Sequence, residues 1–193
     1  MMETDSDGAL VLRLRQDDLS ALGILFERYR TQVYRTAFAI THDADAAEDI
    51  LQDTLLKVYS YAQQLDPTVS LAPWLYRVAV NLSYTWTTRH QKRWTPLENV
   101  VEHLISPMRH APDKVVEYNE MQSQTRQAIQ ELPFNQRVVI VLHYLNDLDL
   151  PEIADILDQP VGTVKSQLYY ARENLRRKLG SSNLDSEVAH GYA

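Results

Sequence analysis

The sequence predicts an all-α protein: two small helical domains joined by a flexible linker, the C-terminal one a helix-turn-helix. The 193 residues include only five glycines and eight prolines, so helices can run long without interruption. Residues 95–113 hold three prolines and show no sustained periodicity, as is typical of a linker. A short helix, a tight turn and a longer helix follow near the C-terminal end. We therefore place the first domain at 8–93, the linker at 94–113, the second domain at 114–180 and a disordered tail at 181–193.

Composition excludes several classes of protein. The chain has no cysteine, which excludes a disulfide framework, a thiolate zinc site and a cysteine nucleophile. The absence of cysteine also fits a reducing cytoplasm. The first residues, METDSDG, are acidic and unlike a secretory signal, and no apolar run of about 18 residues occurs. We therefore expect a cytoplasmic protein without membrane insertion.

Helical periodicity defines four helices in the first domain. They are expected at 9–16, 19–41, 46–65 and 74–94, with Asp17 or Asp18 capping the second. The apolar stripe of the second helix contains Leu22, Leu25, Phe26, Tyr29, Val33, Phe38 and Ile40. The inward face of the third contains Ala47, Ile50, Leu51, Thr54, Leu55 and Val58. On the fourth, one side carries Leu75, Val78, Ala79, Leu82 and Trp86, and the other carries Arg77, Asn81, Tyr84 and Thr88.

The net charge of −7 is distributed unevenly along this domain. Residues 41–66 hold six acidic residues and one lysine, whereas residues 67–97 hold no acidic residue. An acidic helix face is a poor surface for DNA and a good one for a protein partner, although from the charges alone an ordinary solvated face is the favoured interpretation. The acid-free segment suits single-stranded DNA, because Tyr84 can stack on a base and Asn81 can bond a base edge. The basic side chains that can follow the DNA backbone are Arg77, Arg89, Lys92 and Arg93.

The second domain has the spacing of a helix-turn-helix over residues 150–179. Asp149 and Glu152 are placed to cap the short helix, and Gln159-Pro160 makes the turn into the long one. The two helices would pack through Ile153, Ala154, Leu157, Val164, Leu168, Ala171 and Leu175. The remaining face offers groups that could read base edges or hold phosphates: Thr163, Lys165, Ser166, Tyr169, Tyr170, Arg172 and Arg176. A solvated helix face is the alternative, and the exposed tyrosines among cations favour DNA.

Residues 132–179 resemble the region 4 domain of extracytoplasmic-function (group IV) sigma factors. The resemblance rests on L-P-x-x-x-R, on P-E-I-A at the start of the short helix, and on P-V-G-T-V-K-S and A-R-x-x-L-R in the long one. Many relatives have arginine where this chain has Gln167 and Tyr170, and the loss of two cations would weaken phosphate binding. The resemblance implies that this domain reads the −35 promoter element and contacts the flap of the β subunit of RNA polymerase.

The segments FERYRTQVYRTAFAI, DAAEDILQDTLLKVY and PWLYRVAVNLSYTW resemble region 2 of the same family. This resemblance implies an alternative sigma factor whose first domain docks on the β′ clamp helices of core RNA polymerase and opens the −10 element. The docking residues would be Asp49, Gln52, Asp53 and Leu56. A flipped base would enter a pocket beside the loop at 65–71, which adds Leu65 and Asp66 to the residues assigned to the −10 element. The family also implies an anti-sigma partner, which no residue identifies.

Two other functions were weighed against this one. An enzyme would need a catalytic constellation, but His42, Asp43 and Asp45 lie where a helix start calls for capping residues, and no phosphate loop or nucleophile motif occurs. We therefore predict no catalytic residue, metal or cofactor. A free-standing helix-turn-helix regulator would explain the second domain equally well, but it would not explain an acidic helix followed by an acid-free aromatic one.

Overall fold

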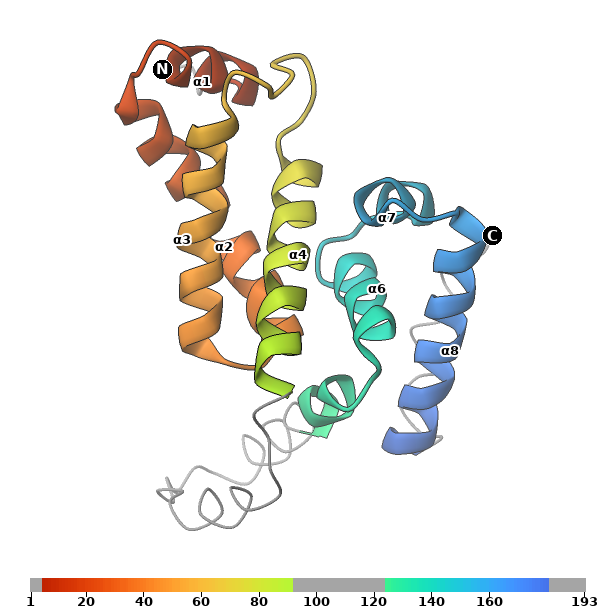
Figure 1. The fold of residues 1–193 in the computed structure, drawn as a ribbon. Helices are drawn as coiled ribbons and strands as arrows, with labels where there is room; N and C mark the ends of the chain where they lie inside the picture. Colours follow the sequence, from red (N-terminus) through yellow and green to blue (C-terminus); the bar gives the residue numbers. More distant parts are fainter. Residues whose placement is uncertain (1–4, 92–123, 181–193) are drawn as a thin grey trace, which may run out of the picture.

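The computed structural model describes residues 5–91 and 124–180, and every regular element in these two segments is a helix (Figure 1). The predicted linker, the predicted tail and the predicted DNA-binding residues Lys92 and Arg93 lie outside the described residues. None of the described helices is long and apolar enough to cross a membrane.

The N-terminal domain contains α1 (Asp7–Leu14), α2 (Leu19–Thr41), α3 (Ala44–Tyr61) and α4 (Ala72–Gln91). The three long helices lie side by side, and α1 lies across one end of them, next to the loop that joins α3 to α4 (Figure 1). All six residues predicted for the inward face of α3 are buried. The core of this domain includes Leu10, Leu14, Leu25, Val33, Val58 and Leu75.

Side-chain caps set where these helices begin. Of the two candidates for the start of α2, Asp18 is the N-cap and accepts a hydrogen bond from the Ser20 amide, whereas Asp17 adopts a left-handed conformation with φ 59°. Asp43 caps α3 by accepting from the Ala46 amide at 2.8 Å. The residue before it, His42, ends α2 in a left-handed conformation.

The C-terminal domain contains a helix at 124–130, then α6 (Phe134–Tyr144), α7 (Leu150–Leu157) and α8 (Val161–Leu179). The predicted capping box is present: Asp149 accepts from the Glu152 amide, and the Glu152 carboxylate accepts from the Asp149 amide, both at 2.8 Å. The predicted contacts between α7 and α8 are confirmed, with Ile156 as an additional buried residue and Leu157 only partly buried.

The two domains pack against each other through α4 with α7 and α2 with α6. Ile40, Tyr76 and Val80 of the first domain belong to one apolar cluster with residues of the second. The Arg137 side chain crosses between the domains: one nitrogen donates to Ile40 O at 2.5 Å, and another donates to Gln130 O at 2.7 Å and Leu132 O at 3.1 Å. This arginine of the L-P-x-x-x-R segment therefore joins the end of the helix at 124–130 to α2 of the first domain.

Candidate nucleic-acid interface

The predicted docking residues on α3 form one exposed surface, which we call the acidic surface: Asp49, Gln52, Asp53 and Leu56. Leu56 is 58% exposed, which is unusual for a leucine in the middle of a helix. Beside it lies an apolar groove between α2 and α3, where Leu22 and Phe26 face Leu55 and Leu56. Leu19 of α2 also lines this groove and is 59% exposed. Gln52 also lines the groove, and Asp49 and Asp53 are exposed on the same helix. An exposed apolar groove beside polar groups suits a protein partner.

A second feature is the loop pocket, a cavity of about 370 Å³ beside the segment between α3 and α4. Its walls come from α1, α3, the loop and α4: Val11, Tyr61, Gln64, Leu65, Asp66, Val69, Ser70, Leu71 and Trp74. Leu65 is buried, whereas Asp66 is exposed and accepts hydrogen bonds from the Thr68 hydroxyl and amide. Those hydrogen bonds hold the pKa of Asp66 below its ordinary value. Sequence reasoning found Leu65 and Asp66 but missed the aromatic walls, Tyr61 and Trp74.

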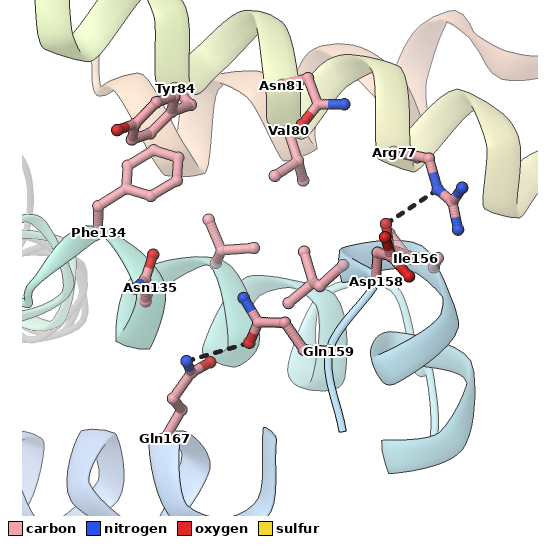
Figure 2. Close-up of a pocket in the computed structure, with 12 residues that line it drawn as sticks. Arg77, Val80, Asn81, Tyr84, Phe134, Asn135, Ile156, Asp158, Gln159 and Gln167 are labelled. Atoms are coloured by element: carbon pink, nitrogen blue, oxygen red, sulfur yellow. Dashed lines mark hydrogen bonds between the residues drawn. The ribbon is translucent and has the colours of Figure 1, made fainter. Parts of the chain in front are cut away.

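The predicted DNA face of α4 lines a different cavity, the interdomain pocket, of about 380 Å³. Figure 2 shows Arg77 directed from α4 toward Ile156 and Tyr84 directed toward Phe134, whereas Asn81 lies alongside α4. Arg77 donates to Ile156 O at 3.0 Å and also to Asp155 O, at the end of α7. The Tyr84 ring meets the Phe134 ring edge to face, with centroids 5.2 Å apart.

The structure therefore places Arg77, Asn81 and Tyr84 along one pocket, and all three side chains remain exposed. Arg77 and Tyr84 contact the second domain, whereas Arg89, in the last turn of α4, is exposed away from these contacts. A polynucleotide that used Arg77 and Tyr84 would have to replace their contacts with α7 and α6.

The outward face of α8 is the third surface, and it is open to solvent. Lys165, Tyr169 and Tyr170 are exposed, and the two tyrosine rings meet edge to face at 5.5 Å. Ser166 donates to Thr163 O at 2.8 Å, within the first turns of the helix. Arg176 pairs with Glu173 at 3.3 Å. Near its start, the helix presents a basic and aromatic surface of the kind that enters a major groove.

Two side chains of α8 lie differently from the rest. Arg172 is half-buried against α6, where it donates to the Tyr144 hydroxyl at 2.8 Å and its guanidinium lies 5.5 Å from the Tyr144 ring centre. Gln167 donates to Gln159 Oε1 at 3.2 Å and lines the interdomain pocket (Figure 2). Of the two positions where relatives carry arginine, Gln167 therefore takes part in packing, and Tyr170 remains on the exposed face.

The residues considered for metal binding are used in other ways. Asp43 caps α3, and in the described part of the chain no group of three or more histidine and acidic side chains could hold a metal ion. The His42 ring is buried, and neither ring nitrogen has a hydrogen-bond partner among the described residues. Burial, reinforced by the positive charges of Arg137 and Arg126, lowers the pKa of His42 to about 4.

This histidine predicts a specific pH dependence of stability. Because its pKa is lower in the folded chain than the ordinary 6.5, the unfolded chain binds the proton first as pH falls. The free energy of unfolding should therefore decrease by about 1–2 kcal/mol between pH 7 and pH 5. His42→Asn, which keeps a residue that tolerates the left-handed conformation, should flatten this decrease in urea unfolding curves. Equal slopes for the two proteins would contradict the assignment.

Two protein-family models match the chain. The model described as "Sigma-70 region 2" matches residues 25–93, and the model described as "Sigma-70, region 4" matches residues 122–175. The first covers α3, the loop pocket and α4, and the second covers the helix-turn-helix. The matches therefore fall on the same two domains that carry the three surfaces.

Two sigma factors are similar to the chain over most of its length. The chain is 31% identical to the ECF RNA polymerase sigma-E factor of Haemophilus influenzae over 189 residues, covering 93% of this chain and 98% of that protein. It is 29% identical to the ECF RNA polymerase sigma factor SigW of Bacillus subtilis, over 88% of this chain and 94% of that protein.

Two solved structures share the fold at 21% identity each. One is CnrH in complex with the cytosolic domain of CnrY, with a TM-score of 0.66 over 92% of this chain and 99% of that one. The other is the sigma factor RpoE in complex with the anti-sigma factor NepR from Bartonella quintana, with a TM-score of 0.60 over 86% of this chain and 97% of that one.

Proposed function

The chain belongs to the extracytoplasmic-function (ECF) family of RNA polymerase sigma factors, and we propose how its surfaces divide the work of promoter-specific initiation. It is an alternative sigma factor, and a free-standing regulator is not supported, because the family resemblance extends over both domains. The observation that carries the division is the presence in one chain of an apolar groove beside the acidic surface of α3, a loop pocket and an open basic helix. We assign no catalytic residue.

The acidic surface and its groove would bind core RNA polymerase. Leu56 and Leu19 expose apolar surface whose burial against a partner would be favourable. Asp49, Gln52 and Asp53 supply the polar groups around it. By similarity to the family, the partner would be the clamp helices of the β′ subunit. The negative charge would also keep this surface away from promoter DNA.

The loop pocket would hold a base of the opened −10 element. A cavity of about 370 Å³ with Tyr61 and Trp74 in its wall offers aromatic surface for stacking, and Asp66 offers a carboxylate at its rim. Asn81, Tyr84 and Arg77 would contact the neighbouring single strand, with Arg89, Lys92 and Arg93 following its backbone. The α8 face, with Lys165, Ser166 and Tyr169, would read the −35 element in the major groove.

Promoter binding requires the domains to separate. The two elements lie about 25 base pairs apart by their names, or on the order of 80 Å along B-DNA at 3.4 Å per base pair. Two domains in direct contact, each about 30 Å across, cannot reach both elements at once. In the packed arrangement Arg77 also donates to α7, and Asn81 lines the pocket between the domains. We infer that the structure represents a closed state and that the polymerase binds an open one.

An anti-sigma protein is a further partner suggested by similarity. The structural relatives CnrH and RpoE were solved with CnrY and with the anti-sigma factor NepR, respectively. We propose a partner of the same kind for this chain, and its presence would be tested by co-purification from the native host.

The polymerase surface is tested by replacing Gln52→Ala together with Asp53→Ala. We expect the affinity for core RNA polymerase to fall by about tenfold, because Gln52 lines the proposed docking groove and Asp53 is exposed next to it on α3. Size-exclusion co-elution of the full chain with core enzyme, repeated over a dilution series, measures this loss. Lys165→Ala is the matched control and should co-elute as the unsubstituted chain does. Full co-elution of the double variant would refute this surface.

The α8 surface is tested by Lys165→Ala. On a promoter that the holoenzyme selects from a library with randomised −10 and −35 elements, we expect transcription to fall by about tenfold. Scrambling the −35 element should remove the difference between the two proteins, since the lost contact is made there. A variant that lost activity equally on the scrambled promoter would place Lys165 outside the −35 interface.

A further inference from the structure

We propose that α1 positions the base-binding loop: Arg15, Gly8 and Asp7 fix the shape of residues 62–71 and thereby act on promoter opening without touching DNA. This inference rests on the proposed role of the loop pocket. Helix α1 precedes residue 25, where the region 2 match begins. The family match therefore assigns it no role.

Arg15 holds the beginning of the loop. Its Nε donates to Ala62 O at 2.9 Å, and its Nη2 donates to Leu65 O at 2.6 Å. Ala62 is the C-cap of α3, so its carbonyl has no partner within the helix and lies at the negative end of the helix dipole, where a positive charge is favourable. A planar guanidinium can bond both carbonyls at once, and it therefore fixes the direction in which the chain leaves α3. In return, the Gln63 amide group donates to Arg15 O at 3.2 Å.

Gly8 lies under the middle of the loop. A Cβ atom at this position would stand 1.9 Å from Pro67 O and 3.0 Å from Pro67 C. Both neighbours are backbone atoms, so no side chain can turn aside to make room. The residue at position 8 must lack a side chain for the loop to come this close to α1.

Asp7 holds the end of the loop. Its Oδ2 accepts from the Leu71 amide at 3.2 Å, just before α4 begins, and also from the Tyr29 hydroxyl. Its Oδ1 accepts from Arg28 at 2.5 Å. Burial acts to raise the pKa of Asp7, but the hydrogen bonds from Tyr29 and Arg28 outweigh it and hold the pKa below its ordinary value. The carboxylate is therefore charged at neutral pH and anchors the loop to α2.

These three residues fasten the loop at its start, middle and end, whereas the pocket itself is lined from α1 by Val11 alone. The aromatic walls Tyr61 and Trp74 flank the two fastened ends. A change in the loop path would separate them from Leu65 and Asp66, and a flipped base would lose its stacking surface. The expected effect of loosening α1 is therefore a loss of base binding rather than a loss of folding.

The test couples Arg15 to the flipped base in the complete holoenzyme. Promoters from the selection described above are prepared with an abasic nucleotide at each non-template position of the −10 element, and open-complex lifetime is measured. With the unsubstituted chain, one position should lose about tenfold in lifetime, as expected when one base loses its stacking platform. Arg15→Met should shorten the open-complex lifetime about tenfold on the intact promoter. On the abasic promoter its lifetime should equal that of the unsubstituted chain.

Three further variants complete the design. Arg13→Met is the matched control, because Arg13 also lies at the end of α1, but it bonds Asp5, Asp18 and Ser20 rather than the loop. It should leave unchanged the preference for the intact base, which is the ratio of open-complex lifetimes on the intact and the abasic promoter. Arg15→Lys, which keeps the charge but cannot bridge two carbonyls, and Gly8→Ala should both reduce this preference, and each gives an answer if Arg15→Met does not fold.

The outcomes separate the inference from the function on which it rests. If Arg15→Met shortens lifetimes by the same factor on intact and abasic promoters, α1 supports folding only, and the positioning role is wrong while the pocket stands. If the unsubstituted chain shows no dependence on any base of the non-template strand, the base pocket itself is wrong, and the positioning role falls with it.

Discussion

A disulfide between positions 36 and 146 is expected to abolish promoter-directed transcription until it is reduced. Asn146 Nδ2 donates to Thr36 Oγ1 at 3.0 Å across the domain interface, so Thr36→Cys combined with Asn146→Cys places two thiols on facing side chains, where a disulfide can be formed by oxidation. The chain contains no other cysteine, so no competing pairing within it is available. Oxidation would hold α2 against the second domain, and the closed pair of domains cannot reach both promoter elements.

We expect the oxidised variant to lose at least a hundredfold in multiple-round transcription and to recover when a reductant is added. The chain is oxidised before core enzyme is mixed with it, so that only the sigma factor carries the bond. Each single cysteine variant serves as a control and should be active under both conditions. If the oxidised variant transcribes at the reduced rate, the closed state described above is compatible with promoter binding, and the inferred separation of domains is wrong.

The helix faces that are buried within one domain could be predicted from spacing alone. The inward face of α3 contains six predicted residues that are all buried, because among the described helices α3 packs mainly against α2 and α4 of its own domain. The capping box at Asp149 and Glu152 was also predicted, since it depends on residues three positions apart. Local chemistry determines both features, and distant residues do not alter them.

The face of α4 could be predicted only in part, because α4 is buried on two sides. Leu75 and Ala79 pack in the first domain as expected, but Tyr76 and Val80 are buried in a cluster with the second domain. A periodicity argument assumes one buried stripe per helix, and nothing within the segment 74–94 reveals the second. The same limit explains why Arg77 was assigned to DNA without its hydrogen bonds to α7.

The loop pocket shows the same division between local and distant information. Leu65 and Asp66 were identified from the family resemblance of the loop, whereas Val11 and Trp74 join them from other elements. The need for a glycine at position 8 depends even more on distant residues, because the atom that leaves no room for a side chain belongs to Pro67, nearly sixty residues later in the chain. A single sequence without the fold gives no sign of that contact.

Arg137 was recognised in the L-P-x-x-x-R segment without a physical role, and the structure provides one with a large expected effect. Arg137 is 8% exposed, and its guanidinium donates to the carbonyls of Ile40, Gln130 and Leu132. Hydrogen bonds from a charged donor are worth about 1.5–3 kcal/mol each, and a removed donor leaves the buried carbonyls unpaired. Arg137→Met should therefore lower the free energy of unfolding by about 3 kcal/mol, measured by urea denaturation.

The matched control is Arg30→Met, because Arg30 is exposed and its ion pair with Glu27 lies within one helix at 3.2 Å. That variant should change the free energy of unfolding by less than about 0.5 kcal/mol. Arg137→Lys separates charge from geometry: a single ammonium cannot satisfy carbonyls in two domains, so most of the loss should remain. If Arg137→Lys were as stable as the unsubstituted chain, the positive charge alone would be sufficient, and the three directed hydrogen bonds would not be what joins the domains.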